Sequence, residues 1–349
     1  MLKTAWYYFV KLYVKTGLFF YTKKIKVSGL ENIPKKDAVL FVSNHPNGLL
    51  DPLIIATHNP RINHFLVRAA VFKNPLTKKI LASLNLMPIY RIRDGKDQLS
   101  KNNEIFNHCF ELLKNKETLL IFPEGTHNQM RRIRPINKGF TRILFGAIDK
   151  YPDLEITVIP VGITYQKVSF FPSKIALKYG KPIRANTFYN RENLHNATNT
   201  LKEKVKTALE KNTVCITQEK NYTNTLSKLN KANVDFTNVD AVNQMLQKET
   251  YPLPKKATKN YTKPLLYLIV LNSLIPYFLW KKIEKKIDEI EFIDTFRFGL
   301  NTVLFPLFYA LQSLVIYRIC NLKIASMYFI ASFLLVFIYS KSYPTNTKG

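Results

Sequence analysis

The sequence predicts an α/β protein: a mostly parallel sheet flanked by helices, with an amphipathic helix before it and transmembrane helices after it. Two observations lead to this prediction. Short runs rich in β-branched residues alternate with helical patterns from Gly29 to about Ile183, as in domains built around a parallel sheet. From Pro264 onward, apolar runs close to the length needed to cross a bilayer replace that alternation.

The chain divides into four parts on this pattern. We expect a membrane-interface helix over residues 1–26, the α/β domain over 27–185, a polar helical extension or linker over 186–262 and a membrane segment over 263–341. The chain has 349 residues, of which 46% are hydrophobic, which is enough for one such domain and a further element.

The N-terminal 26 residues carry aromatic and aliphatic side chains and no acidic residue, with Lys11 and Lys15 interrupting the apolar run. The two lysines argue against a spanning helix. Two interpretations follow: an amphipathic helix lying in a membrane interface, or a terminal helix packed on the domain with its lysines in water.

The alternation in the α/β region predicts six strands and four helices. The expected strands are Ala38–Ser43, His64–Arg68, Pro88–Arg91, Thr118–Phe122, Thr157–Tyr165 and Lys174–Tyr179. The expected helices are Pro52–Ala56, Leu76–Leu84, Asn102–Asn115 and Lys138–Ala147. In the polar region that follows, Leu201–Leu209 and Val239–Leu246 read as helical.

The membrane segment contains three apolar runs, Leu265–Trp280, Leu300–Tyr317 and Ile324–Tyr339. Lysines flank the first run on both sides, whereas only Arg318 and Lys323 lie between the last two. Positive-inside bias therefore favours a hairpin over 300–340 with both ends cytoplasmic, and leaves the first run spanning, re-entrant or interfacial. The alternative is a helical layer buried in a soluble protein.

The charge and the rarer residues exclude several classes. Lys and Arg number 52 and Asp and Glu 24, giving a net charge of +28 that suits nucleic acid or phosphate headgroups. The 11 glycines are too widely spaced for GxGxxG, GxxxxGK or GxSxG. Three distant cysteines and six histidines without an HExxH pattern predict neither a disulfide framework nor a zinc site. We therefore expect no cofactor and no metal.

A histidine and a carboxylate follow the first buried strand. In the segment AVLFVSNHPNGLLDPLIIA, Asn44 and His45 come directly after the strand, and Asp51 precedes Pro52. An imidazole can take a proton from an alcohol while a carboxylate fixes its tautomer and orientation. Because no activated Ser or Cys accompanies them, direct attack by a substrate hydroxyl is favoured over a covalent intermediate. Considered alone, Asp51 is equally well explained as the N-cap of a helix beginning at Pro52.

Basic side chains end a second strand. Arg91 and Arg93 stand in LMPIYRIRDG, where strand alternation puts both on one face and allows two guanidinium groups to clamp a phosphate. Ordinary surface arginines are the alternative.

A turn and a proline-containing strand complete the pattern. Glu124, Gly125 and Thr126 follow a buried strand in LLIFPEGTHNQMRRIRPINKG, where backbone amides and side chains can meet a small polar substrate, and Lys138 opens the next helix. The basic run between them reads partly as a solvated loop. Pro160, in VIPVGITY, suits the lining of an acyl slot and core packing equally.

Taken in this order, the four segments resemble the glycerolipid acyltransferase family, which includes lysophosphatidic acid and glycerol-3-phosphate acyltransferases. That family has an NHxxxxD block, an Arg-ending block, an FPEGT block and a final strand with Pro. Here they fall at Asn44, His45 and Asp51, at Arg91, at 122–126 and at Pro160, and the resemblance covers residues 5–185.

The resemblance implies that His45 deprotonates the acceptor hydroxyl, that Asp51 orients His45, and that Arg91 with nearby basic groups holds the acceptor phosphate. Glu124 and Gly125 would help to place the acceptor. The full set expected at the acceptor phosphate is Asn44, Arg91, Arg93, Glu124, Gly125, Thr126 and Lys138, with Pro160 in the acyl-donor region.

The substrates and location follow from the same resemblance. The donor would be acyl-CoA or acyl carrier protein, and the acceptor lysophosphatidic acid or glycerol 3-phosphate, in phospholipid biosynthesis. The expected partner is a lipid membrane, with the domain facing the cytoplasm. Basic groups close to an anionic leaflet account for part of the charge without nucleic acid.

Two departures bear on the acceptor. Five residues separate His45 from Asp51 where the commonest form has four, and His127 stands where many members carry Arg. The longer loop looks like one branch of the glycerol-3-phosphate acyltransferases, and we expect Gly48 to give it freedom to close. The other readings are a silent lipid-binding protein on the same scaffold, a hydrolase in which His45 activates water, and a nucleic-acid binder.

Overall fold

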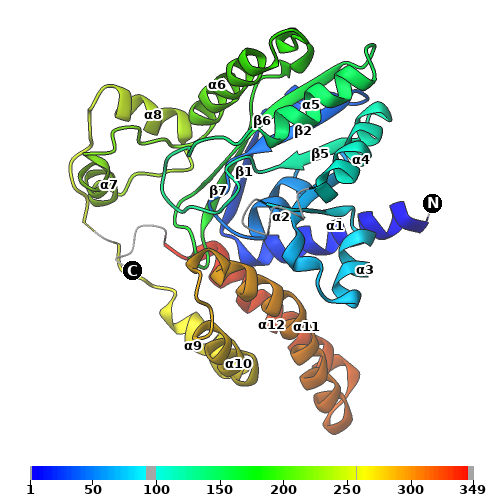
Figure 1. Ribbon diagram of the computed structural model, residues 1–349. Coiled ribbons are helices and arrows are strands. Elements are labelled where there is room, and N and C mark those ends of the chain that lie inside the picture. Colours follow the sequence, from blue (N-terminus) through cyan, green and yellow to red (C-terminus); the bar gives the residue numbers. More distant parts are fainter. Residues whose placement is uncertain (1, 92–99, 257, 345–349) are drawn as a thin grey trace.

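The protein is described by a computed structural model that covers residues 2–91, 100–256 and 258–344 (Figure 1). Its strands are β1 (Lys24–Ser28), β2 (Ala38–Ser43), β3 (Asn63–Arg68), β4 (Leu86–Ile89), β5 (Thr118–Ile121), β6 (Ile156–Tyr165), β7 (Lys174–Tyr179) and β8 (Ile183–Arg184). Around them lie α1 (Leu2–Tyr21), α2 (Leu50–Thr57), α3 (Pro75–Ser83), α4 (Asn102–Lys114), α5 (Gly139–Lys150) and α6 (Leu194–Asn212). The remaining helices are α7 (Tyr222–Lys231), α8 (Val239–Gln247), α9 (Lys263–Asn272), α10 (Leu274–Glu284), α11 (Ile293–Ile319) and α12 (Leu322–Ser342).

The strands form one sheet in the order β1-β7-β6-β2-β5-β3-β4, with β8 beside β6. Only β6–β7 and β6–β8 pair antiparallel among the described strands. The predicted α/β class with a mostly parallel sheet is therefore confirmed. All six predicted strands are present with small shifts at their ends, whereas β1 and β8 were not predicted. Since β4 ends at Ile89, Arg91 follows the strand and does not end it, which corrects the prediction.

Helices cover both faces of the sheet because the buried strands are apolar on both sides. Leu40 and Val42 of β2 pack with α4, α5 and α6, whereas Val39 and Phe41, between them in sequence, pack with α1 and α2. Helix α6 thus belongs to the domain, although the sequence suggested that the domain ends at residue 185. Helices α7 and α8 form a separate small cluster with the β7 residue Ala176 (Figure 1).

Helix α1 combines the two interpretations drawn from the sequence. It ends at Tyr21, earlier than expected, and packs on α2 and α11, with Leu18 fully buried. Large apolar side chains on its other face, including Trp6, Phe9 and Leu12, are exposed. The helix is therefore docked on the domain and still offers an aromatic surface outward.

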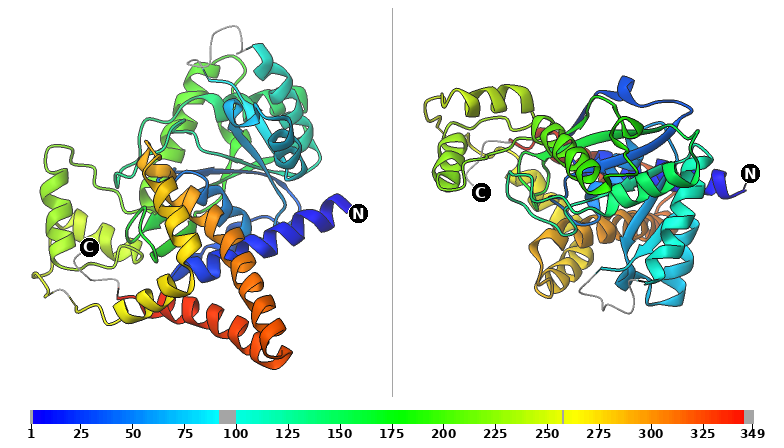
Figure 2. Two further views of the ribbon diagram at one scale, coloured as in Figure 1. Left: turned by 90° about the horizontal axis from the view of Figure 1, so that it is seen from below. Right: turned by 45° about the horizontal axis from the view of Figure 1, so that its top comes forward.

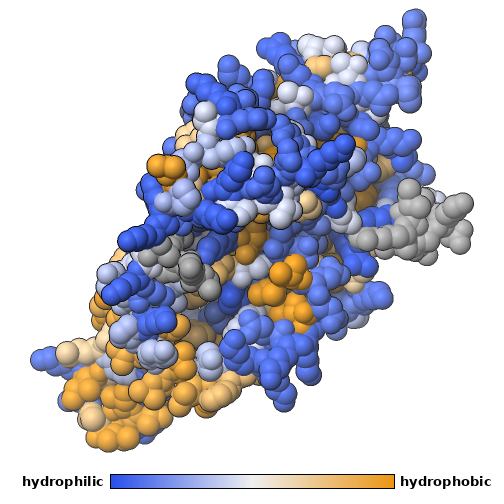
Figure 3. Space-filling model, turned by 90° about the vertical axis from the view of Figure 1, so that its left-hand side faces the viewer, coloured by the Kyte–Doolittle hydropathy of each residue, from blue (hydrophilic) through white to orange (hydrophobic). Residues whose placement is uncertain are grey.

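The C-terminal helices project from one side of the domain (Figure 2). Helices α11 and α12 pack side by side, and each is long and apolar enough to cross a membrane. Figure 3 shows apolar surface gathered over the end of the molecule that these helices and α9 and α10 form. Exposed members of this surface include Leu307, Leu314, Ile330 and Leu334. A buried helical layer, the alternative drawn from the sequence, does not fit this exposure.

The first apolar run is not one straight helix. It forms α9 and α10, which meet at Ser273 with a bend of 100°. Pro276 explains the break, because a proline has no N–H to donate to the carbonyl of Asn272, four residues earlier. The geometry is that of a broken span or a re-entrant loop.

Candidate active site

His45 and Asp51 meet beyond the carboxyl end of β2. His45 follows the strand by two residues, and its Nδ1 lies 2.8 Å from Oδ2 of Asp51. Asp51 is fully buried in the first turn of α2. Because α2 begins at Leu50, Asp51 is inside the helix, and the N-cap interpretation is wrong. The Asp51 carboxylate instead bonds to the imidazole of His45.

Two further donors fix the Asp51 carboxylate. The backbone N–H of Asn47 donates to Oδ2 at 2.7 Å, and the hydroxyl of Tyr165, at the end of β6, donates to Oδ1 at 2.7 Å. With His45, three groups hold this carboxylate, so its orientation toward the imidazole is preset.

Burial keeps the imidazole of His45 neutral. Desolvation, followed by the positive charge of Arg134, lowers the pKa of His45 to about 3. Burial also raises the pKa of Asp51, while the hydrogen bonds from Asn47 and Tyr165 oppose that rise. A neutral imidazole that presents Nδ1 to a carboxylate leaves Nε2 available as a base.

Aromatic rings enclose His45. Phe122, at the end of β5, stacks on it with ring centroids 3.9 Å apart, and His127 meets its ring edge-on at 4.2 Å. Phe292, just before α11, packs on His127 in turn at 5.1 Å. The His45 side chain is only 12% exposed. The ring is therefore largely shielded from solvent, partly by the C-terminal part of the chain.

The segment after β5 forms a tight turn beside His45. The N–H of Gly125 donates to the carbonyl of Phe122 at 3.2 Å, closing a turn with Pro123 at its second position. Gly125 has φ of +75°, and a Cβ there would meet Nδ2 of Asn137 at 2.8 Å. Glycine is thus required at this position.

Two arginines converge on the turn. Nη1 of Arg91 donates to the carbonyl of Gly125 at 2.9 Å, and Nε of Arg134 donates to Oε2 of Glu124 at 2.9 Å. Arg134 also donates to the carbonyl of Thr126. The Glu124 side chain is 3% exposed, so solvent screens its ion pair with Arg134 only weakly. The turn thereby gathers two guanidinium groups next to His45.

The basic run after the turn does not act as one unit. Arg131 is buried over the ring of Phe236, and Arg132 pairs with Glu219 on the surface. Only Arg134, of these three, is bonded to the turn. The expectation that part of the run is a solvated loop fits Arg132 alone.

The amide side chain of Asn44 bonds to the backbone of β6. Its Nδ2 donates to the carbonyl of Ile163 at 3.0 Å, and its Oδ1 accepts from the Ile163 N–H at 2.8 Å. The amide thus continues the ladder between β2 and β6 past Ser43. Both ends of the amide are engaged with backbone, so Asn44 positions the loop, and its part in binding the acceptor phosphate stays a prediction.

The other predicted residues divide between core and surface. Pro160 is buried within β6, where its carbonyl accepts from the Gly180 N–H at 2.8 Å, and β8 and β7 pair on either side of it. Its missing N–H thus faces the gap between those two strands, which explains a proline in a central strand. Thr126 is half-buried, and Lys138 is exposed immediately before α5. Arg93 lies outside the described residues.

The loop between His45 and Asp51 is held from the C-terminal side. The Gly48 N–H donates to the carbonyl of Glu291 at 3.0 Å, and the Leu49 N–H donates to Oγ1 of Thr295 at 2.9 Å. A Cβ on Gly48 would lie 2.8 Å from that same Oγ1. Gly48 therefore permits a close approach of α11, and its expected role in loop freedom is wrong: its backbone is fastened.

Sequence reasoning missed three polar groups of this site: Tyr165, Asn47 and Asp294. Tyr165 ends a predicted strand beside the one that leads to His45, so its position at the same sheet edge was a usable signal. Asn47 and Asp294 meet through a hydrogen bond across 247 positions of sequence, for which no local pattern exists.

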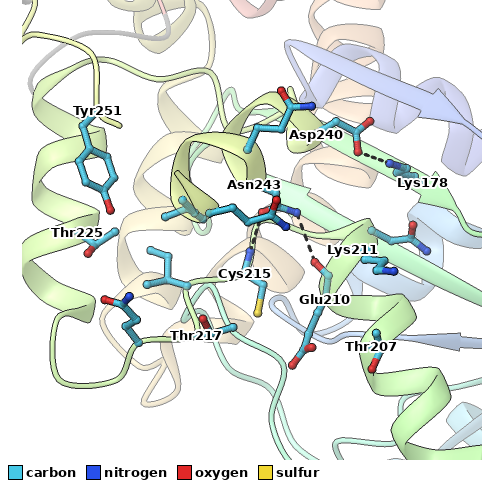
Figure 4. Close-up of a pocket in the computed structure, with 16 residues that line it drawn as sticks. Lys178, Thr207, Glu210, Lys211, Cys215, Thr217, Thr225, Asp240, Asn243 and Tyr251 are labelled. Atoms are coloured by element: carbon cyan, nitrogen blue, oxygen red, sulfur yellow. Dashed lines mark hydrogen bonds and ion pairs between the residues drawn. The ribbon is translucent and has the colours of Figure 1, made fainter. Parts of the chain in front are cut away.

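A separate cavity of about 710 Å³ lies between β7, α6 and α8 (Figure 4). Its lining includes Lys178, Glu210, Cys215 and Asn243, whose amide accepts from the Cys215 N–H and donates to the Glu210 carbonyl. His45 and Asp51 are not among its lining residues.

The fold and site define an α/β domain with a buried imidazole, held by a carboxylate, at the carboxyl edge of a mainly parallel sheet. Comparisons with known proteins agree with the resemblance seen in the sequence. Residues 24–164 match the family model described as Acyltransferase. Through this segment, the chain is similar to the glycerolipid acyltransferases.

Individual relatives match over limited stretches. Glycerol-3-phosphate O-acyltransferase 1 of Saccharomyces cerevisiae is 26% identical over 32% of this chain and 15% of that protein. A chloroplastic 1-acyl-sn-glycerol-3-phosphate acyltransferase of Arabidopsis thaliana is 28% identical over 38% of this chain and 35% of that protein. The corresponding enzyme of Borreliella burgdorferi is 25% identical over 48% of this chain and 61% of that protein. This chain thus spans less than two thirds of each.

One solved structure also aligns. It is the 1-acyl-sn-glycerophosphate (LPA) acyltransferase PlsC from Thermotoga maritima, at 23% identity and a TM-score of 0.44, over 60% of this chain and 80% of that one.

Proposed function

We propose that this protein is a membrane-bound O-acyltransferase that moves a fatty acyl group from acyl-CoA or acyl carrier protein to a glycerol phosphate acceptor, lysophosphatidic acid or glycerol 3-phosphate. The observation that carries the proposal is the 2.8 Å contact of a neutral, buried His45 with Asp51. The family and the names of the relatives supply the substrate class.

The chemistry balances with the groups present. Nε2 of His45 takes the proton from the acceptor hydroxyl as its oxygen attacks the thioester carbonyl carbon. The tetrahedral intermediate collapses by breaking the C–S bond, and the thiolate leaving group takes the proton back from the imidazolium. The Asp51 carboxylate stabilises the imidazolium that exists between these steps. The products are the acyl ester and the free thiol.

The basic groups at the turn suit the acceptor phosphate. Arg91 and Arg134 lie beside the turn and both bond to its carbonyl oxygens. A phosphate can displace or share these neutral carbonyl partners, since charge-assisted bonds are the stronger ones, whereas Arg134 would keep its ion pair with Glu124. Arg91→Ala should therefore mainly raise the KM for a phosphate-bearing acceptor, and an unchanged KM would place the phosphate elsewhere.

The direct test uses membranes that contain the protein, an acyl-CoA or acyl carrier protein thioester, and either glycerol 3-phosphate or lysophosphatidic acid. We expect labelled lipid from one acceptor, and none from His45→Ala or Asp51→Ala variants that remain folded and membrane-associated. Retained turnover in the His45 variant contradicts the mechanism. Loss of thioester without an acceptor identifies a hydrolase, and membrane association without any turnover identifies a silent lipid-binding protein.

The membrane arrangement is part of the proposal. Helices α11 and α12 form a spanning hairpin whose two ends adjoin the domain. The lysines around α9 and α10 favour the cytoplasmic side for the domain and for both ends of the hairpin. An acyl chain gains about 0.8 kcal/mol per buried CH₂, so substrates that stay in the leaflet avoid extraction.

A charge placed in α12 tests the hairpin. Leu334 is half-exposed in the middle of α12, so Leu334→Arg should lower the membrane-bound fraction, because Arg costs about 2.5–3.5 kcal/mol at a helix centre. Leu194, equally exposed on α6, is the matched control, and Leu194→Arg should leave partitioning unchanged. Equal partitioning of both variants contradicts the hairpin.

A further inference from the structure

Helix α11 reaches the catalytic loop with a cluster of polar groups at its N-terminal end. Asp294 is 2% exposed, and its Oδ2 accepts from Nδ2 of Asn47 at 2.8 Å. Asn47 also donates its backbone N–H to Asp51. One residue of the loop therefore links the carboxylate that orients His45 to a carboxylate on a candidate membrane helix.

Asp294 is itself rigidly held. Its Oδ1 accepts from the hydroxyl of Tyr21 at 2.6 Å and from Arg297. Nε of Arg297 donates to the same tyrosine hydroxyl at 2.8 Å. A buried carboxylate with three donors, one of them a guanidinium, has a single orientation, so it is a firm anchor for the Asn47 amide.

The contacts to the loop repeat along the start of α11. Gly48 bonds to the carbonyl of Glu291, and Leu49 bonds to Thr295. Three consecutive loop residues, Asn47 to Leu49, are thus each tied to residues 291–295. These residues lie far beyond the segment 24–164 that matches the acyltransferase family.

We propose that Asp294 is a positioning residue: through Asn47 it fixes the loop that joins His45 to Asp51, so the start of α11 completes the active site. The expected effect on kcat rests on the proposed acyl transfer. The claim that Asp294 fixes the loop through Asn47 does not. It predicts that the family domain alone is catalytically incomplete in this chain. It also places the base where a helix enters the bilayer, next to lipid substrates.

The kinetic test uses the full chain in lipid nanodiscs. Asp294→Ala should lower kcat by about 100-fold, the cost of a misplacement of about 1 Å, with the KM of both substrates little changed. Asp294→Asn keeps one acceptor oxygen and should lose less activity. Asn47→Ala keeps the Asp294–Arg297 pair and replaces the Asp294 variants in the test if they fail to fold. It should also lower kcat.

Tyr309→Phe is the matched control. Tyr309 is also buried in α11, and its hydroxyl bonds to Ser273 Oγ at 2.8 Å, away from the loop. Disturbing α11 there should leave kcat unchanged. A kcat of Asp294→Ala, per folded molecule, equal to that of the wild type or of Tyr309→Phe overturns the proposal.

A second readout does not need activity. Hydrogen exchange of peptides covering residues 44–50 should be faster in Asp294→Ala than in the wild type, and unchanged in Tyr309→Phe. Unchanged exchange in Asp294→Ala refutes the positioning role. If His45→Ala still transfers acyl groups, or the wild type transfers none, the proposed function fails, and the exchange measurement still decides the role of Asp294.

Discussion

The hydroxyl of Tyr165 donates a 2.7 Å hydrogen bond to Oδ1 of Asp51, on the carboxylate oxygen that His45 does not use. The bond joins the last residue of β6 to the first turn of α2 and sets the rotation of the carboxylate. It therefore determines the direction in which Nε2 of His45 points.

Replacing Tyr165 by Phe should lower kcat by about 10-fold, because a hydrogen bond to a charged group is worth roughly 1.5–3 kcal/mol and part of that acts on orientation. The control is Tyr179→Phe: this buried tyrosine of β7 bonds to the carbonyls of Ile55 and His58 instead. It should lower the unfolding temperature without changing kcat. Equal kcat for both variants contradicts an orienting role for Tyr165.

The pH dependence of catalysis follows from the burial of His45. Desolvation, aided by Arg134, lowers its pKa from 6.5 to about 3, so the base form persists as the pH falls well below neutral. We expect kcat/KM to show no acid limb near pH 6.5 when measured between about pH 5 and pH 8. Phe122→Ala removes the ring that covers His45, so it should raise the pKa of His45 and bring an acid limb toward pH 6.5. An acid limb near pH 6.5 in the wild type would contradict the desolvated imidazole.

Unlike kcat/KM, the free energy of unfolding should fall in acid. Burial, as the largest cause, lowers the pKa of His64 from 6.5 to about 4, and the unfolded chain then binds more protons than the folded one between these values. Folding free energy is therefore lost as the pH falls from 6.5 toward 4. At about pH 5 the loss for one such histidine is about 2 kcal/mol. The unfolding temperatures at pH 7.5 and pH 5 should differ less in His64→Gln than in the wild type. An equal difference would refute the assignment of this acid sensitivity to His64.

Two neighbouring arginines offer a matched comparison for phosphate binding. Arg134 is bonded to Glu124 and to the carbonyl of Thr126, whereas Arg132 pairs with the exposed Glu219. Arg134→Ala should raise the acceptor KM by about 10-fold or more, as expected for a lost charge-assisted contact. Arg132→Ala removes the same charge from the same loop and should leave the KM unchanged. Similar KM values for the two variants would mean that only the general positive potential matters.

The part of the fold that local pattern controls was predictable. The apolar runs of β2, β5 and β6 predicted the centre of the sheet, because buried strands have nearly continuous apolar sequences. The β1 segment KIKVS was missed because it alternates lysine with apolar residues and sits on the sheet edge. The break between α9 and α10 needed Pro276 to be weighed against a run that is apolar throughout.

The site was predictable to the extent that motifs encode it. His45, Asp51, Arg91 and the turn at Gly125 lie together as expected from strand ends that share one sheet edge. The bonds of the Asn44 amide to the backbone of Ile163 were not predicted, because only the neighbouring strand reveals them. Asp294 was beyond reach, since nothing in an apolar C-terminal segment indicates which domain loop its first turn will meet.

Gly48 gives the most direct test of the contact between that first turn and the loop. A Cβ at this position would lie 2.8 Å from Oγ1 of Thr295 and 3.1 Å from the carbonyl oxygen of Glu291, so Gly48→Ala must push the two segments apart. We expect kcat to fall by less than the roughly 100-fold that a shift of about 1 Å in a catalytic group costs, because these contacts are relieved by a smaller displacement. Gly139→Ala is the control, because a Cβ on this first residue of α5 meets nothing within 4 Å. It should leave kcat unchanged and favour the helix slightly. Wild-type kcat in Gly48→Ala would show that catalysis tolerates a small separation of the loop from residues 291–295.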